Sequence, residues 1–386
     1  MRYTLMNKNI ELLVMDVDAK TGRINELCGI RNENSQYLPI ELSQLGSYGG
    51  AKSRLTDWWR NRIIPSSRIG INEALSKISC SDSDSLAVKS LGLNLSDQYW
   101  IRPNAEVKWE NVNFFTNDFS EDIGNLLLSG RWTGGSLISP DSATNGIVRK
   151  MWKIIRGRRC LFKGSFQESF QTEPFREVFA SKMLYKLLDG LEKRYHVLYG
   201  LLFNTSGLTR SVYSVCENFV TPDTEYVAFN QINASYKRPV RMSPFDFCAS
   251  FYGSKKWVLE VMLILDYIVL NEDRHYGNFG IIRDVNSCEI LGPAPIFDTG
   301  SSLFHDRVAI NPKSLASMPF SSNFEKQLNF VDVKRYREQL IGLQWVYKDL
   351  FYQSFDGCFE DKSRIDRLCD IVGIQISKLL RIADSR

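Results

Sequence analysis

Histidine and paired cysteines are scarce in this 386-residue chain, which has three histidines and eight cysteines without a Cys-x-x-Cys pair. A structural zinc site needs such ligands at short spacings, so the sequence argues against one. The first residues lack an apolar stretch ending in small residues, and no secretory signal is expected. The longest apolar run, 257–270, carries Glu260 and Asp266 and is too short to span a bilayer. These absences predict a reducing, cytoplasmic protein without a membrane partner.

Charge of one sign is not in large excess either. The formal net charge is +4, so no nucleic acid or acidic membrane surface is required as a partner, and direct nucleic-acid binding is not expected. Ligands that bear phosphate stay open. With 44% hydrophobic and 24% charged residues, the composition is that of a globular protein, and the length predicts one large domain or two to three subdomains.

A second Asp-Thr-Gly motif is also missing. The run Asp298-Thr299-Gly300 would fit the catalytic loop of an aspartic protease, but such an enzyme needs two close carboxylates, from a second motif or a second chain. The 88 residues after Asp298 are mostly patterned as helix, whereas a protease would hold this motif in an all-β lobe. Asp298 therefore needs another explanation.

The order of local patterns predicts an α+β, two-lobed fold like that of protein kinases, with a small β-rich N-lobe, a larger helical C-lobe and an extra N-terminal region. Residues 1–130 form an N-terminal α/β region of unknown role, with strand-like runs such as "IELLVMDV". Residues 131–219 contain a hairpin, "GIVRKMWKII" and "RCLFKG" with Gly157 at its turn, then the helix "EPFREVFASKMLYKLLDG" and the strand "TRSVYSVCENFV". Residues 220–386 are mainly helical, with an apolar helix ending at Leu270 and two short strands after it.

The stretch "LDYIVLNEDRHYGNFGIIRD" carries the residues that phosphoryl transfer requires. That chemistry needs a carboxylate near the attacking hydroxyl and oxygen ligands for a metal on the phosphates. Asp273 would be the base or orienting carboxylate, and Asn278 would be one magnesium ligand. Asp298, after the following strand pair, would be the second ligand, since a carboxylate suits a hard cation.

The spacing Asp-x4-Asn is weak support by itself, because it occurs three times, at Asp266/Asn271, Asp273/Asn278 and Asp306/Asn311. Only the second pair lies on a polar, glycine-containing loop between an apolar helix and a strand pair. A loop aspartate with a capping asparagine is the alternative interpretation.

Residues upstream supply candidates for the nucleotide. Lys163 ends an apolar strand and would reach the α and β phosphates, held by Glu177 on the following helix. Glu173 is the rival partner, and an edge lysine with a solvated helix glutamate is the simpler alternative. In "VCENFV", Glu217 and Phe219 occupy the position of a kinase hinge, although a plain strand end has the same pattern.

The stretch "SPDSATNGIVRKMW" would line an anion site with backbone amides around Thr144, Asn145 and Gly146. It is not a Gly-x-Gly-x-x-Gly loop, and alone it indicates a turn.

Together, "TNGIVRKMWKIIRGRRCLFKG", "EPFREVFASKML", "VCENF", "NEDRHYGNFG" and "PIFDTGSSL" resemble the HipA-like serine/threonine protein kinases, over about residues 131–380. The best-known members are bacterial toxins of toxin-antitoxin pairs. The resemblance implies ATP and Mg²⁺ as cofactors, a protein substrate and an antitoxin-like partner. It assigns Lys163 to the ATP phosphates, Glu217 and Phe219 to the hinge, Asp273 to catalysis, and Asn278 and Asp298 to magnesium. Residues 1–130 do not resemble the N-terminal segment of the toxin.

Two further expectations come from related loops. "DRHYGN" also resembles the catalytic loop of phosphatidylinositol kinases, which makes His275 a catalytic candidate beside a simple loop role and makes a lipid or small-molecule kinase an alternative function. Some HipA-like kinases are silenced by phosphorylation of their phosphate loop, so self-phosphorylation at Ser139, Ser142 or Thr144 is a hypothesis. A third possible function is that of a nucleotide-binding pseudokinase. The presence of Lys163 together with Asp273, Asn278 and Asp298 argues against it.

Overall fold

The structure is a computed structural model that describes residues 1–43, 50–130, 132, 134–144, 146, 148–165, 171–206 and 209–385. The chain divides by packing into two compact units. The first unit comprises Met1–Lys163, Asn218–Lys237 and Ile282–Leu291, and the second comprises Gly164–Glu217, Arg238–Ile281 and Gly292–Arg386. The predicted boundaries at residues 130 and 219 separate regions by role, and they stay a prediction.

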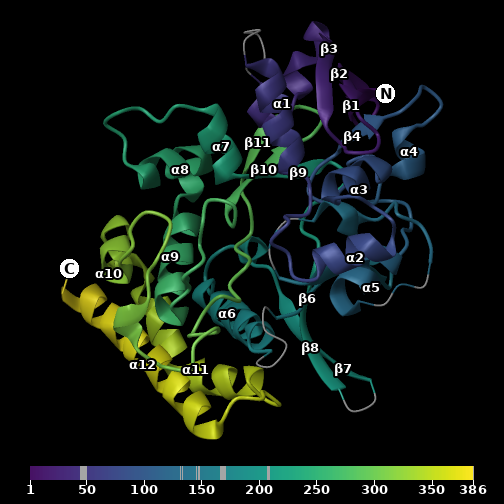
Figure 1. Ribbon diagram of the computed structural model, residues 1–386. Helices are drawn as coiled ribbons and strands as arrows, with labels where there is room; N and C mark the ends of the chain where they lie inside the picture. Colours follow the sequence, from purple (N-terminus) through teal and green to yellow (C-terminus); the bar gives the residue numbers. More distant parts are fainter. Residues whose placement is uncertain are drawn as a thin grey trace. The chain divides into compact units, whose positions relative to one another are not determined.

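The first unit is built on short antiparallel strands with helices between them (Figure 1). Its strands are β1 (Arg2–Asn7), β2 (Ile10–Val17), β3 (Ile24–Ile30), β4 (Tyr99–Arg102), β5 (Lys150–Ile155), β6 (Arg158–Lys163) and β9 (Thr224–Ala228). Its helices are α1 (Ala51–Arg60), α2 (Ile71–Lys77), α3 (Ser83–Lys89), α4 (Trp109–Val112), α5 (Asp122–Ser129) and α7 (Phe229–Ser235). One sheet has the order β3-β2-β1-β4.

Tryptophan side chains fill much of the core of this unit. Trp58 and Trp59 of α1 are buried against the sheet, and Trp58 meets Tyr99 of β4 edge to face at 6.2 Å. The predicted hairpin forms between β5 and β6, where Arg156 and Gly157 both have positive φ. Positive φ at both central residues gives the tight two-residue turn that matches strand twist, which is why glycine occurs there.

The second unit is mainly helical. Its helices are α6 (Glu173–Leu187), α8 (Pro244–Tyr252), α9 (Trp257–Val269), α10 (Phe324–Gln327), α11 (Arg337–Ser354) and α12 (Lys362–Ser385). Strands β7 (Tyr199–Ser206) and β8 (Thr209–Glu217) form an antiparallel hairpin in it. The division between the units falls inside β10 (Gly280–Asp284) and β11 (Ile290–Pro293). Short 3₁₀ turns occur at Asn32–Tyr37, Ile40–Leu42, Pro140–Ala143, Lys193–Tyr195, Gly253–Lys255, Pro312–Ser314, Leu328–Phe330 and Val333–Tyr336.

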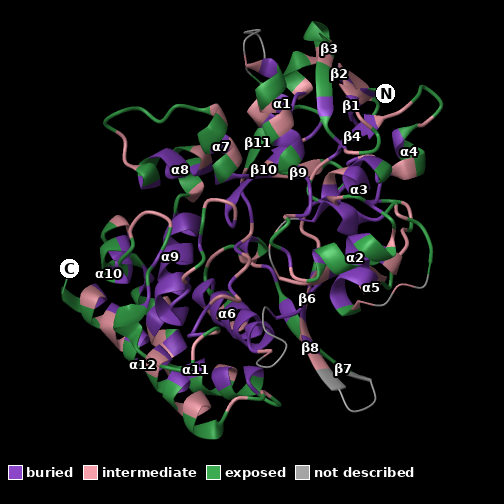
Figure 2. Cartoon of the chain, viewed as in Figure 1, coloured by how far each residue is buried: buried purple, intermediate pink, exposed green. Residues whose placement is uncertain are grey.

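Helix α9 is the centre of the second unit and is buried along its whole length (Figure 2). Its sequence is apolar on all sides, as a fully enclosed helix requires. Its two acidic side chains both have buried partners, since Glu260 accepts from the Tyr336 hydroxyl at 2.6 Å and Asp266 pairs with Arg274. Among the described residues, no helix combines the length and the apolar character that crossing a membrane would require.

The strand and helix patterns singled out in the sequence correspond to observed elements. The run "IELLVMDV" is β2, and the predicted amphipathic helix near 173–190 is α6, which ends at Leu187 rather than near Gly190. The predicted strand "TRSVYSVCENFV" gives β8, and the two runs after the apolar helix give β10 and β11. Strands β1, β3, β4 and β9 were not singled out.

Candidate active site

The loop between α9 and β10 is organised by one buried arginine. Arg274 has no exposed surface, and its guanidinium forms two hydrogen bonds with Asp266, Nε to Oδ2 at 2.9 Å and Nη2 to Oδ1 at 3.0 Å. Its Nη1 donates to the carbonyl oxygens of Asn278 at 2.9 Å and of Phe297 at 2.5 Å. Because these bonds involve a charged group in a dry site, they fix the loop strongly. Arg274 therefore joins the end of α9 to the loop and to the residue before Asp298.

Asp273 and Asn278 are brought together within this loop. The Asn278 side chain donates from Nδ2 to the carbonyl oxygen of Asp273 at 2.9 Å, and its backbone N–H donates to the carbonyl oxygen of His275. Asn278 is buried, whereas Asp273 is exposed. The asparagine is thus held by a side chain to main chain contact, and the aspartate carboxylate stays accessible to a reacting group.

Asp298 lies close enough to Asp273 for their charges to interact. The pKa of Asp273 is raised, first because the surrounding protein reduces hydration of its carboxylate and further because of the negative charge of Asp298, while His275 opposes the shift. Asp298 itself has φ of +57°, in the left-handed region that L-residues rarely adopt. Such backbone conformations persist where the surrounding structure over-determines them, and they cluster at functional sites.

The donor set at Asn278 and Asp298 fits a hard divalent cation. The Nδ2 atom of Asn278 is used in the bond to the Asp273 carbonyl oxygen, so Oδ1 is the side-chain atom that would be available to a cation. An amide oxygen and a carboxylate are the ligands that Mg²⁺ takes when phosphate oxygens and water complete its octahedron. In the described ranges, no group of three or more histidine, cysteine, aspartate or glutamate side chains is arranged to hold a metal by itself.

The three Asp-x4-Asn pairs play different structural roles. Asn271 caps the end of α9, where its N–H and its Nδ2 both bond Asp266. Asn311 caps the turn at Lys313 with its side-chain oxygen, and Asp306 pairs with Arg307 at 3.3 Å. The capping interpretation describes these two pairs, and the Asn278 side chain also bonds its own loop at the Asp273 carbonyl oxygen. What marks the loop pair is that the charge of Asp298 acts on Asp273.

His275 is exposed on the same loop. Its Nδ1 accepts the backbone N–H of Gly277 at 3.0 Å, so the neutral ring carries its proton on Nε2. A second histidine, His305, affects the electrostatics of Asp273 as well, and burial lowers its own pKa. The loop thus presents an exposed imidazole donor two residues after Asp273.

The segment that follows Asp298 is fastened by buried arginines. Arg176 of α6 donates twice to the carbonyl oxygen of Leu303, at 3.1 and 3.0 Å, and pairs with Glu360 at 3.1 Å. Arg364 of α12 bonds the same Glu360 oxygen at 2.6 Å and the carbonyl oxygens of Phe304, Arg307 and Val308. The backbone from Leu303 to Val308 is thus held by two guanidinium groups that share one carboxylate.

Glu177 and Glu173 lie near the turn after Asp298. A Cβ built on Gly300 would be 3.5 Å from the Cβ of Glu173 and 3.9 Å from that of Glu177. Glu177 is buried and accepts from the Ser214 hydroxyl at 2.5 Å. Lys163, the predicted partner of Glu177, ends β6 in the first unit. Their pairing would join residues of different units and stays a prediction.

The hinge candidates stand at the end of β8. Glu217 is the last residue of that strand and is exposed, while the Phe219 ring meets Tyr226 edge to face at 5.8 Å in the first unit. The backbone N–H of the intervening Asn218 donates to the carbonyl oxygen of Arg159 at 2.8 Å.

The phosphate-loop candidates are mostly buried. Thr144 receives a hydrogen bond from Arg68 Nη1 at 2.6 Å, and Arg68 Nε donates to the carbonyl oxygen of Gly146 at 2.9 Å. Asn145 lies outside the described residues. The proposed self-phosphorylation residues Ser139, Ser142 and Thr144 have 0%, 0% and 8% exposure, so a kinase would reach them only after the segment opened.

Several residues of this site were not predicted from the sequence. Arg274 had a local signal, because Asp266 in an apolar helix needs a buried cation nearby. Arg176 had no such signal, because α6 carries several other charged residues and its burial is seen only in the structure. Arg68 stood in a basic run at 60–68 without any sign of its target. Glu360 and Arg364 had no local signal, because their partners lie far away along the chain.

Comparison with known proteins finds similarity in structure but not in sequence. No family model matches the sequence, and no curated protein matches it. Among solved structures, HipA from the Shewanella oneidensis MR-1 toxin-antitoxin complex with HipB and operator DNA aligns over 99% of both chains, with 11% identity and a TM-score of 0.53. The Helicobacter pylori proinflammatory kinase CtkA aligns over 61% of this chain and 93% of its own, with 18% identity and a TM-score of 0.44.

The alignment with HipA includes the N-terminal region that showed no resemblance in sequence. The chain has a HipA-like kinase fold, and the predicted two-lobed, kinase-like α+β class is confirmed.

Proposed function

We propose that this protein is an ATP- and Mg²⁺-dependent kinase that transfers the γ-phosphoryl group of ATP to a serine or threonine of another protein. The observation that carries the proposal is the set of bonds made by Arg274. This one side chain ties the loop of Asp273 and Asn278 to the residue preceding Asp298. A base and two oxygen ligands joined in this way are what phosphoryl transfer asks of a protein.

The roles follow from the positions of the side chains. Asp273, exposed on the loop, would orient the acceptor hydroxyl and take its proton. Asn278 Oδ1 and the Asp298 carboxylate would hold Mg²⁺. The cation, when bound, would neutralise charge that develops on the phosphate oxygens. His275 would donate from Nε2 toward the transferred group. Because the arginine bonds preset these groups, little reorganisation would be needed during transfer.

The proposed nucleotide contacts rest on their order along the chain. Lys163, with Glu177 as its partner, would meet the α and β phosphates, and backbone groups of Glu217 and Phe219 would meet the adenine edge. The turn at Thr144, Asn145 and Gly146 would line the phosphates. Of these residues, Glu177 and Glu217 belong to the second unit. Asp273, Asn278 and Asp298 belong to the second unit as well.

The deciding experiment compares transfer by the wild type and by Asp273→Asn. Purified protein would be incubated with labelled ATP, Mg²⁺ and a lysate of the native host as the acceptor pool. We expect a labelled protein band that is stable to acid, as phosphoserine and phosphothreonine are and phosphoramidates are not. The band is expected to be lost in Asp273→Asn, while ATP binding by calorimetry persists. Asp306→Asn is the matched control, because it has the same Asp-x4-Asn spacing and is also exposed. Equal labelling by Asp273→Asn would refute the proposal.

A lipid or small-molecule kinase is the second candidate, favoured by the exposed His275 and its Nε2 proton. An acceptor screen with lipid vesicles, sugars and peptides under the same conditions separates the two. If ATP binds but no acceptor is labelled, the protein is a nucleotide-binding pseudokinase.

Biological context adds three proposals. We propose that the protein is cytoplasmic, that it binds an antitoxin-like partner, and that it phosphorylates itself at Ser139, Ser142 or Thr144. Affinity purification from the host tests the partner. Mass spectrometry after incubation with ATP tests the modification, and an unmodified 139–144 segment would remove it.

A further inference from the structure

The two C-terminal helices share an exposed surface that the proposed function does not use. Helices α11 and α12 lie side by side (Figure 1). Along α12, one set of exposed or half-exposed residues recurs at spacings of three and four and so forms one stripe. We call this the α12 stripe, and its members are Arg367, Asp370, Ile374, Ser377 and Arg381. Ile374 is 52% exposed at its centre, and Trp345 of α11 is 82% exposed.

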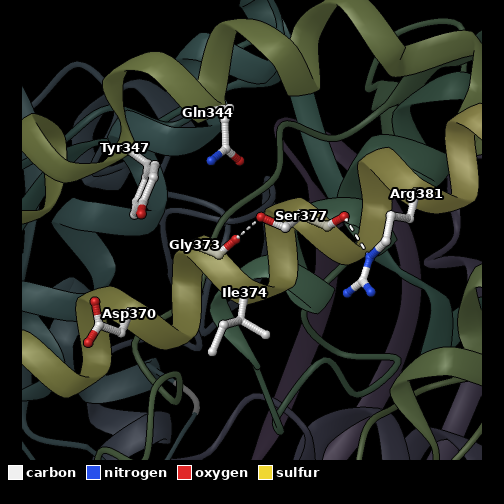
Figure 3. A pocket seen from close by; sticks show the side chains of 7 residues that line it. All are labelled: Gln344, Tyr347, Asp370, Gly373, Ile374, Ser377 and Arg381. Atoms are coloured by element: carbon white, nitrogen blue, oxygen red, sulfur yellow. Dashed lines mark hydrogen bonds between the residues drawn. The ribbon is translucent and has the colours of Figure 1, made fainter.

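A hollow of about 430 Å³ lies between the stripe and α11. Gln344 and Tyr347 come from α11 and point toward α12, which supplies the rest of the lining (Figure 3). Gly373 lets Tyr347 approach α12 closely, because a Cβ at that position would lie 2.3 Å from the Tyr347 hydroxyl oxygen. The side-chain oxygen of Gln344 is buried and has no hydrogen-bond donor within the described part of the chain.

The charges of the stripe are arranged symmetrically about the middle of the helix. Asp370 and Arg381 lie equally far from the midpoint between Gln375 and Ile376, and they are about 16 Å apart along the axis. Arg367 and Asp384 are symmetric about the same point, with Asp384 also paired to Arg337 at 2.8 Å. A helix that packs antiparallel on a copy of itself about that point brings each acid opposite a base. Parallel packing in register would set like charges against each other.

We propose that this surface binds a second copy of the chain, through a two-fold contact in which α12 packs antiparallel on α12. Asp370 of each copy pairs with Arg381 of the other, and Ile374 of each copy lies over Ser377 and the hollow of the other. Contacts of this isologous kind are self-complementary by construction. The apolar surface of Ile374 becomes covered, which accounts for a large hydrophobic side chain exposed on this face.

The affinity is limited by the size of the surface. Standard interfaces use roughly 20 to 30 residues a side, and the α12 stripe with its α11 neighbours offers fewer. We therefore expect a reversible dimer with a dissociation constant on the order of micromolar. Since the pairs are exposed to solvent, raising the salt concentration weakens the dimer.

Charge-reversed variants test the register directly by sedimentation equilibrium at several protein concentrations. Asp370→Arg places Arg against Arg in both pairs of its own dimer, and Arg381→Asp places Asp against Asp, so each variant alone is expected to be monomeric. Mixed in equal amounts, the two variants have complementary stripes and are expected to form a heterodimer. The double variant Asp370→Arg/Arg381→Asp is expected to dimerise again. Glu289→Arg, an exposed acid in the other unit, is the matched control and is expected to behave as wild type.

Circular dichroism of every variant verifies that α12 stays helical. A wild-type chain that is monomeric up to about 100 μM, well above the expected micromolar dissociation constant, overturns the proposal and assigns the hollow to a different occupant. A dimer that is unaffected by the single variants, or that is restored neither by mixing nor by the double exchange, overturns it as well.

Discussion

Arg274 and Asp266 face each other through two parallel hydrogen bonds of 2.9 and 3.0 Å, and both side chains are buried. The bond pair crosses from the last turns of α9 to the loop that carries the proposed base. Since Asp266 also holds Asn271 at the end of the helix, one carboxylate orders the entire entry to the loop. The site is thus built on the most deeply buried helix of its unit.

Replacing Arg274 by lysine tests whether this geometry, rather than the charge alone, positions the loop. Lysine keeps the positive charge beside Asp266. It lacks the planar guanidinium group that bonds the carboxylate twice and also donates to two carbonyl oxygens. We expect turnover to fall by about 10- to 100-fold, since displacements near 1 Å have effects of that size. Steady-state kinetics measures the turnover, and calorimetry checks that ATP still binds. The exposed Arg335→Lys is the control, and turnover equal to wild type in Arg274→Lys would contradict the assignment.

Asp298 offers a test that separates metal binding from stability. At φ of +57°, glycine removes the steric cost of the left-handed conformation, which is about 1 kcal/mol, and asparagine tolerates it. We expect Asp298→Gly to be at least as stable as wild type, and both Asp298→Gly and Asp298→Asn to need at least about tenfold more Mg²⁺ for half-maximal transfer. Thermal denaturation and a Mg²⁺ titration provide the two readouts. An unchanged Mg²⁺ requirement would remove Asp298 from the metal site.

The parts of the fold and site that the sequence predicted are those set by local patterns. The turn at Gly157 needs positive φ, and the apolar sequence of α9 needs complete burial. A few adjacent residues are therefore enough to predict each of these elements. Asp273 and Asn278 are only five positions apart, and a loop of that length keeps them together. Their proximity to Asp298 followed from the short strand pair between them, whose ends return to the same place.

The parts that the sequence did not predict depend on contacts between distant segments. The bonds from Arg176 to Leu303 and to Glu360 span 127 and 184 positions, and no periodicity reports such pairs. The sheet order β3-β2-β1-β4 likewise depends on β4 pairing with β1 across more than ninety residues, which local propensity does not specify. Buried charges gave a partial signal, because each needs a counter-charge, but the identity of that partner is a property of the packed structure.

The shared carboxylate of Glu360 gives a prediction about the segment after Asp298. Burial alone would raise its pKa, but Arg176 and Arg364 together lower it, so Glu360 is ionised between two guanidinium groups. Glu360→Gln removes that charge and leaves both cations uncompensated at a site with 6% exposure. We expect the free energy of unfolding to fall by about 3 kcal/mol. We also expect trypsin to cleave faster after Arg307, whose carbonyl is held by Arg364.

Limited proteolysis with mass spectrometry identifies that cleavage site, and urea denaturation gives the free energy. Glu338→Gln is the matched control, because Glu338 is 85% exposed beside Arg337. If Glu360→Gln left cleavage after Arg307 at the wild-type rate, the arginine network would not be what holds the segment.

His196 predicts how stability depends on pH in the second unit. Burial lowers the pKa of its imidazole to about 4, and Nε2 lies 2.8 Å from the Ser181 hydroxyl, whose own proton goes to the carbonyl oxygen of Val197. In the unfolded chain the pKa is about 6.5. Between pH 4 and pH 6.5, the unfolded state binds a proton that the folded state does not. The stability contributed by neutral His196 is therefore present above pH 6.5 and is lost as the pH falls toward 4. The non-titrating variant His196→Gln is therefore expected to lose less stability than wild type over that range, as measured by thermal denaturation from pH 7 to pH 4. Parallel curves for wild type and His196→Gln would show that the imidazole is not kept neutral by burial.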